Sequence, residues 1–261
     1  MVSFVVVYAG FAVLAVLMTV AQRRWPASAN VPDALSGRAV DWQWWLFSPL
    51  VTGSLTRAVT WGVVVVVARA AGSDVDALLA AFASPLQRAP FAVQIIVALV
   101  VADVVGYVSH RLRHTRVFWP FHAVHHSPRA LDWLAAARMH PIDDVVDNVA
   151  VGVAILLCGL DAAVLAFVGP ILLLHTMFIH ADVAWDFGFV FASPAFHRRH
   201  HRRSDHSAGN FAQMFPILDV IGGTYDPGAA DAFGVDDDAV PLSSLPAQLA
   251  WPFVAMWRRL R

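Results

Sequence analysis

Residues 110–126 read HRLRHTRVFWPFHAVHH, and residues 193–201 read SPAFHRRHH. His110 and His114 are four residues apart in the first stretch, and an H-x-x-H-H pattern occurs once in each stretch. In a helix, residues i, i+3 and i+4 share one face, so the members of each pattern can point into one site. The two stretches predict short helical segments that meet around a cluster of imidazoles.

The number of clustered histidines predicts more than one metal ion. Eight imidazoles converge if the segments meet: His110, His114, His122, His125, His126, His197, His200 and His201. A structural zinc needs four ligands, usually with cysteine among them, and this chain has one cysteine. Imidazole binds iron, zinc, copper and nickel. We therefore expect a dinuclear centre, with His140 and His180 as candidate additional ligands, whereas His175 and His206 are expected to have ordinary roles.

The composition is typical of a membrane protein. Hydrophobic residues make up 58% of the 261 residues and charged residues only 14%, against about 45 to 50% and about 25% in soluble domains. The formal net charge is −1, and the arginines occur in short clusters rather than along one basic face. This pattern predicts one membrane-embedded fold unit and argues against nucleic acid as a partner.

Apolar stretches of about 20 residues, the length that crosses a bilayer, define the expected helices. Three such stretches are residues 4–20, 44–71 and 91–108. A fourth, residues 145–179, is too long for one crossing and fits a hairpin bent near residues 159–161. The sequence predicts an all-α integral membrane protein with four or five transmembrane helices and a cytoplasmic helical cap that holds the histidine-rich di-metal site.

Three regions of one fold unit follow from this pattern. Residues 1–109 form the N-terminal transmembrane helices, residues 110–226 the histidine-rich catalytic region with the hairpin, and residues 227–261 a C-terminal tail. Residues 251–261 mix large apolar side chains with arginines, which indicates an amphipathic helix. The positive-inside rule places the metal site at the cytoplasmic face. Six arginines are expected to be cytoplasmic positive-inside charges or lipid headgroup partners: Arg111, Arg113, Arg198, Arg199, Arg202 and Arg203.

Several segments resemble the fatty acid hydroxylase and sterol desaturase superfamily of membrane proteins. The matching segments are DVVGYVSHRLRH at 103–114, FWPFHAVHHS at 118–127, DWLAAARMHP at 132–141, HAD at 180–182, SPAFHRRHH at 193–201, Asn210-Phe211 and DVIGGTY at 219–225. Their order, spacing and flanking residues agree over about residues 100–226. A match of this extent is far more specific than one H-x-x-H-H pattern.

The resemblance implies two iron ions, with zinc as a substitute after purification, bound by the eight clustered histidines together with His140 and His180. It also implies that the chain uses dioxygen to hydroxylate an unactivated C–H bond of a fatty acyl chain, a sterol or an isoprenoid or carotenoid. Electrons would come from a separate reductase with a ferredoxin or cytochrome-type carrier. Asp103, Asp219 and Asn210 are the residues that we expect to support the ligands, and Asp143 and Asp144 are further candidate acceptors.

Other functions remain open from the sequence. Desaturation shares its first hydrogen abstraction with hydroxylation, so a lipid desaturase is an alternative on the same site. A membrane metal transporter should carry its polar ligands at mid-membrane, whereas these clusters flank the spans. A non-catalytic scaffold should lack some of the family's histidines, and none is missing here.

Overall fold

The computed structural model describes residues 4–28, 37–160, 163–203, 208–230, 232–235, 240–242 and 244–259. All regular elements within these ranges are helices, as the sequence predicts. Two isolated β-bridges within the described residues join Pro26 with Val183 and Arg202 with Phe233. Of the residues singled out above, His206 lies outside the described residues, and so does the last residue of the expected bend at 159–161.

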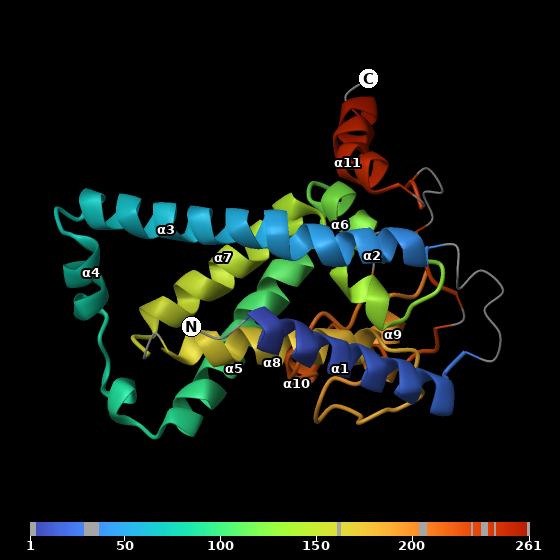
Figure 1. The fold of residues 1–261 in the computed structure, drawn as a ribbon, viewed down its shortest axis with the longest axis horizontal. Coiled ribbons are helices and arrows are strands. Elements are labelled where there is room, and N and C mark those ends of the chain that lie inside the picture. Colours follow the sequence, from blue (N-terminus) through green and yellow to red (C-terminus); the bar gives the residue numbers. More distant parts are fainter. Residues whose placement is uncertain are drawn as a thin grey trace.

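Three helical stretches among the described residues are long and apolar enough to cross a membrane: Arg38–Ala70, Phe91–Arg113 and Ala163–His180. The first is a continuous rod of α2 (Arg38–Phe47), η1 (Ser48–Thr52) and α3 (Gly53–Ala70), which is the longest feature in Figure 1. At about 1.5 Å per residue its 33 residues extend about 50 Å, more than one crossing requires. The two others are α5 (Phe91–Arg113) and α8 (Ala163–His180).

The stretch predicted to be a hairpin contains two helices, α7 (Pro141–Leu157) and α8. Gly159, just after α7, has a φ of 62°, which is a left-handed conformation that favours glycine. A Cβ at this position would also collide with the backbone carbonyl of Phe82. Gly159 therefore both ends α7 and lets the distant 82–84 backbone approach the turn.

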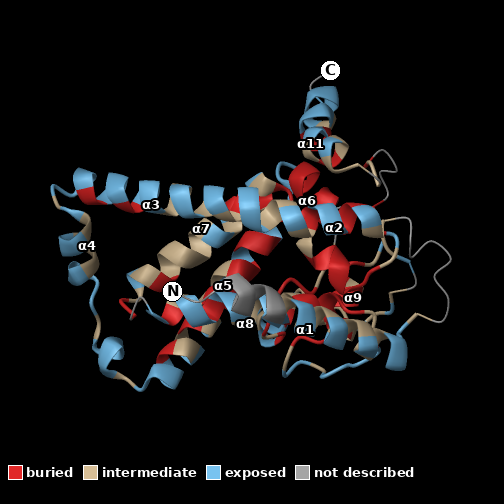
Figure 2. Ribbon diagram, viewed as in Figure 1, coloured by how far each residue is buried: buried red, intermediate tan, exposed pale blue. Residues whose placement is uncertain are grey.

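The remaining helices lie around these rods. They are α1 (Phe4–Arg24), α4 (Val75–Ala81), η2 (Pro85–Arg88), α6 (Trp119–His126), η3 (Trp133–Ala137), α9 (Pro194–His200), α10 (Ile217–Gly222) and α11 (Leu245–Arg259). Figure 1 shows α4 and η2 at one end of the long helices and α6 and α9 toward the other. The two ends also differ in burial: α6 and α9 are mostly buried, whereas α4 has no buried residue (Figure 2).

Small side chains on α5 let it pack closely against α7 and α8. Ala98 and Ala102 of α5 contact Ile155 of α7 and Val164 and Val168 of α8. Farther along α5, toward its C-terminal end, the same helix carries His110. This packing therefore sets where the histidine-bearing end of α5 lies.

The expected C-terminal amphipathic helix begins earlier than residue 251, at Leu245. Its inner face is held by Gln248, whose Oε1 accepts a 2.6 Å hydrogen bond from Trp44 of α2. Its outer face exposes Phe253 and Trp257. In Figure 1, α11 projects from the body at a steep angle to the α2–α3 rod.

A buried ion pair joins α2 to the segment after η3. The Arg138 guanidinium contacts Asp41 Oδ1 at 2.6 Å and also donates to Ser127 Oγ. Both members of the ion pair are almost fully buried. Arg138 precedes the N-terminus of α7, so this pair fixes α2 against the loop that leads into α7.

Replacing Arg138 with Ala should lower the free energy of unfolding by about 3 to 5 kcal/mol, because the substitution leaves the buried Asp41 charge without its partner. Arg202→Ala is the matched control, since the Arg202–Asp226 pair is largely exposed and should contribute at most about 1 kcal/mol. Unfolding of the purified protein in detergent, followed by tryptophan fluorescence, measures both. Equal effects of the two substitutions would contradict this role for Arg138.

Candidate metal centre

Each histidine cluster lies on a short helical segment with its own local signals. His110 and His114 lie one turn apart at the C-terminal end of α5. In α6, Pro120 occupies the first turn, where its missing N–H costs nothing. In α9, Ser193 caps the helix by accepting a hydrogen bond from Phe196 N, and Pro194 follows. These signals set the rotation of each helix, and with it the direction of its imidazoles.

The imidazoles assemble into two groups. The five-histidine group consists of His110, His114, His122, His126 and His200. The four-histidine group consists of His125, His180, His197 and His201. Within each group, one ring nitrogen of every member lies within 4.8 Å of those of all the others. None of the nine side chains is more than 4% exposed.

Each H-x-x-H-H trio divides between the two groups. The members four residues apart stay together, as His122 and His126 do in one group and His197 and His201 in the other. The middle member joins the opposite group: His125 joins the four-histidine group and His200 the five-histidine group. The trios are therefore shared between two adjacent sites.

The two groups are in direct contact. His126 of the five-histidine group stacks on His201 of the four-histidine group, with ring centroids 4.3 Å apart. The His122 and His125 centroids are 5.3 Å apart, and those of His200 and His201 are also 5.3 Å apart. Two cations bound in the groups would therefore be neighbours.

Hydrogen bonds through Nδ1 fix the protonation of four important rings. His110 Nδ1 donates to the Phe211 carbonyl at 2.7 Å, and His122 Nδ1 lies 2.7 Å from Asp143 Oδ2. His180 Nδ1 donates to the Thr176 carbonyl at 2.8 Å, and His125 Nδ1 to the Arg138 carbonyl at 3.1 Å. Because carbonyl oxygens only accept hydrogen bonds, the neutral rings of His110, His125 and His180 carry their proton on Nδ1, and His122 does the same when Asp143 is ionised. Each of these rings then has a free lone pair on Nε2.

These free lone pairs face one another. Nε2 of His110 and His122 are 3.1 Å apart, and Nε2 of His125 and His180 are 3.3 Å apart. Two bare nitrogens cannot hydrogen-bond to each other, so the arrangement needs a cation between them. Nε2 of His126 and His200 is also buried without a hydrogen-bond partner in the described part of the chain. The donor set therefore fits two metal ions, one in each group.

Burial also keeps the ligands in the form that binds metal. It lowers the pKa values of His122, His125 and His126 well below 6.5, with neighbouring positive groups adding to the effect. Burial likewise lowers the pKa of His200 to about 3. These imidazoles are neutral at pH 7, and protons do not compete for their lone pairs.

Asp103 and Asp219 hold a backbone segment rather than a histidine. Asp103 accepts hydrogen bonds from the backbone N–H groups of residues 213–215, and Asp219 from those of Phe211 and Ala212. This segment carries the Phe211 carbonyl that orients His110. The preceding Gly209 carbonyl accepts from Nδ1 of His200 in the same way.

Asn210 lies within that segment and has a φ of 57°, a left-handed conformation that asparagine tolerates better than most residues. Its amide nitrogen donates to the carbonyls of Phe196 and Asp226. Among the described residues, Asn210, Asp103 and Asp219 reach the imidazoles through the backbone. They hold in place the backbone carbonyls that His110 and His200 contact.

His140 is not brought into either group. Its Nδ1 accepts a hydrogen bond from Ile142 N at the start of α7, and its Nε2 lies 3.2 Å from the Leu249 carbonyl of α11. His175 also lies apart, with its Nε2 at 2.7 Å from the Gln213 carbonyl. Among the described residues, the structure thus gathers nine of the ten proposed ligands.

Two of the six arginines expected to be cytoplasmic positive-inside charges or lipid headgroup partners are buried in ion pairs. Arg113 contacts Asp147 at 3.3 Å and Asp143 at 3.7 Å. Arg198 contacts Asp182 at 3.0 Å. These carboxylates take the place of a lipid headgroup for both guanidinium groups, and the cytoplasmic location of the arginines stays a prediction. Asp143 contacts both Arg113 and His122. The sequence favoured Asp103 over Asp143 as a partner of the histidines, although Asp143 lies in the first turn of α7, close to His140.

Comparisons with known proteins agree with this geometry. The family model described as fatty acid hydroxylase matches residues 95–224, which include all nine gathered histidines. An ornithine lipid hydroxylase of Rhizobium tropici is 29% identical over 177 residues, which cover 65% of this chain and 53% of the relative. An alkylglycerol monooxygenase of Caenorhabditis elegans is 30% identical over 137 residues, which cover 48% of this chain and 25% of the relative.

The chain thus spans about half of the first relative and a quarter of the second. No solved structure matches. The family match and the two relatives cover the segment in which the histidines converge, and both relatives are named for the oxidation of lipids. The chain belongs to the fatty acid hydroxylase family.

Proposed function

We propose that this protein is a membrane di-iron oxygenase that hydroxylates an unactivated C–H bond of a lipid-like substrate. The observation that carries the proposal is the pair of buried histidine groups whose bare Nε2 atoms face one another. Such sites bind cations, and two of them in contact form a dinuclear centre. The substrate is a fatty acyl chain, a sterol or an isoprenoid or carotenoid.

Iron is the metal that we propose for both groups. Imidazole binds iron, zinc, copper and nickel, so the ligands alone do not select iron. Zinc has no redox chemistry and would fill the groups without supporting hydroxylation. Bound iron supplies the oxygen chemistry that breaks the C–H bond. Insertion of one oxygen atom and release of the other as water consume two electrons and two protons, which an external reductase with a ferredoxin or cytochrome-type carrier would deliver.

The protein's contribution is to orient the ligands and exclude water. Nδ1 hydrogen bonds from His110, His125 and His180 to backbone carbonyls prevent those rings from turning. Burial of all nine imidazoles removes bulk water from around the reacting atoms. Hydroxylation rather than desaturation is proposed because one relative is named a hydroxylase and the other a monooxygenase.

A lipid fits the position of the groups. His110 lies near the C-terminal end of α5 and His180 is the last residue of α8, two helices that are long and apolar enough to cross a membrane. A lipid in the bilayer would thus reach the metals from between the spans. We propose a multi-pass arrangement of four or five crossings with this end at the cytoplasmic face, which the arginine clusters support.

Removing one ligand from each group should remove metal. In protein purified from iron-supplemented cells, His126→Ala and His201→Ala should each lower the metal content from about two ions per chain to one or fewer, and should abolish lipid hydroxylation. Elemental analysis by mass spectrometry measures the metal, and mass spectrometry of lipid extracts measures the added oxygen.

The control is His140→Asn, which preserves a helix-capping side chain at the start of α7. It should retain both metals, since His140 lies outside the two groups. Full metal content in His126→Ala and His201→Ala, or its loss in His140→Asn, would overturn the assignment of ligands.

Asp143 should act as a positioning residue for His122. Asp143→Asn replaces the carboxylate 2.7 Å from His122 Nδ1 and should weaken metal retention about 10- to 100-fold. Asp144→Asn is the matched control, because this neighbouring carboxylate accepts a hydrogen bond from Asn148. Metal release into a chelator, followed over time, measures retention, and equal release from the two variants would contradict the role of Asp143.

A further inference from the structure

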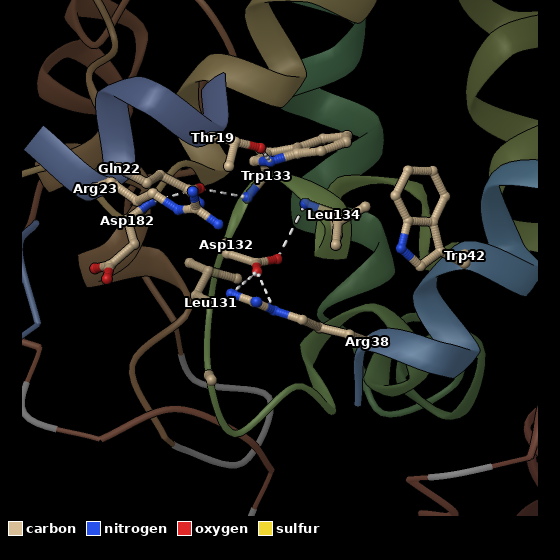
Figure 3. Close-up of a pocket in the computed structure, with 11 residues that line it drawn as sticks. Thr19, Gln22, Arg23, Arg38, Trp42, Leu131, Asp132, Trp133, Leu134 and Asp182 are labelled. Atoms are coloured by element: carbon tan, nitrogen blue, oxygen red, sulfur yellow. Dashed lines mark hydrogen bonds and ion pairs between the residues drawn. The ribbon is translucent and has the colours of Figure 1, made fainter. Parts of the chain in front are cut away.

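A pocket of about 340 Å³, lined by apolar side chains together with several charged and polar ones, lies beside the histidine groups, between the end of α1, the start of α2 and residues 130–134. This volume is at the lower end of small-ligand sites, so the pocket would take the polar end of a lipid rather than its chain. Figure 3 shows side chains from these elements around one space. The polar and charged side chains of its lining include those of Gln22, Arg23, Arg38, Asp132 and Asp182, with Trp42 beside them.

The two arginines and two aspartates that line the pocket sum to zero, and one positive charge remains in excess when Arg198, the partner of Asp182 behind the pocket wall, is counted. Arg38 pairs with Asp132 at 3.1 Å. Asp182 pairs at 3.0 Å with Arg198, which is not among the residues lining the pocket. Arg23 is exposed, and no ion pair or hydrogen bond links it to any other described residue. The pocket therefore offers one uncompensated guanidinium to a ligand.

The pocket wall is held in place by hydrogen bonds. Gln22 Oε1 accepts from the backbone N–H groups of Trp133 at 2.9 Å and Asp182 at 3.1 Å. The Trp133 indole donates to Thr19 Oγ1 at 3.2 Å. Trp42 lies edge-on to Trp133, with centroids 6.0 Å apart. Because Gln22 precedes Arg23, these bonds fix the end of α1 that carries the free guanidinium.

The wall of the pocket continues into the four-histidine group. Asp182 is two residues after His180, which places the two backbones within about 7 Å. Its partner Arg198 follows His197, another member of that group. Trp133 and Leu134 pack on Met177 and Ala181, on either side of His180. A molecule in the pocket would thus lie next to the metal centre.

We propose that this pocket binds the anionic headgroup of the lipid substrate, a phosphate or carboxylate, with Arg23 as its principal ligand and Arg38 beside it. A guanidinium suits such a group because it presents N–H donors in a planar fork. The inference rests on the proposed function, since it names the polar end of the molecule that the metal centre oxidises. Free inorganic phosphate has the same chemistry, so the test separates the two sources.

The test uses the full chain in an uncharged detergent and isothermal titration calorimetry. Dihexanoyl phosphatidylglycerol is the anionic probe, dihexanoyl phosphatidylcholine is the probe without net charge, and inorganic phosphate is the free anion. Arg23→Gln should weaken phosphatidylglycerol binding about tenfold or more, because it removes a charged hydrogen-bond donor. Arg23→Lys keeps the charge and should retain most of the binding. Arg24→Gln, which removes the next arginine of α1, is the matched control and should bind like the wild type.

Equal binding of phosphatidylglycerol to the wild type, Arg23→Gln and Arg24→Gln would overturn the proposal. If phosphatidylcholine binds as tightly as phosphatidylglycerol, the pocket does not select an anionic headgroup. If inorganic phosphate alone binds as tightly, the pocket is a site for the free anion and the lipid headgroup proposal is overturned. Metal content is measured on the same samples. Two ions in the wild type and in Arg23→Gln would show that the metal centre is intact. Absence of metal in both would contradict the proposed function, and the binding data alone would then show whether the pocket binds an anionic headgroup.

Discussion

The structure depends on the buried imidazole nitrogens that face each other without a proton between them. In the His110–His122 and His125–His180 pairs, hydrogen bonds direct the ring proton to Nδ1, so both Nε2 lone pairs point inward at 3.1 and 3.3 Å. Their mutual repulsion is relieved by a cation between them, and burial lowers the pKa values of the cluster histidines on α6 and α9, which disfavours a proton in that role. A metal in each group is the arrangement that satisfies the ligands.

Distant parts of the chain hold this arrangement. Asp103 in the middle of α5 and Asp219 of α10 secure the backbone segment whose Phe211 carbonyl orients His110. Asp41 of α2 holds Arg138, whose own carbonyl accepts from His125. Buried carboxylates thus act through backbone carbonyls on the imidazoles. The same end of the molecule carries the pocket, so the two histidine groups and the proposed headgroup site lie next to each other.

Helical spacing made the three clusters predictable from the sequence, because positions i, i+3 and i+4 share a face. Spacing did not reveal that each trio divides between two groups. At 3.6 residues per turn, i+3 and i+4 differ by about 100° around the helix, so His125 and His126 reach different sites. Carbonyl partners such as Phe211 O could not be predicted, since every residue has a carbonyl. His140 matches the family pattern, yet its Nδ1 caps α7 locally and its Nε2 lies at the Leu249 carbonyl of α11, a contact that depends on tertiary packing.

Anomalous X-ray scattering at the iron absorption edge, from crystals of the iron-loaded protein, would locate each bound iron ion. We expect two neighbouring peaks, one among the Nε2 atoms of the five-histidine group and one among those of the four-histidine group. A single peak shared by all nine histidines, or a peak beside His140 instead of within one of the groups, would contradict this expectation.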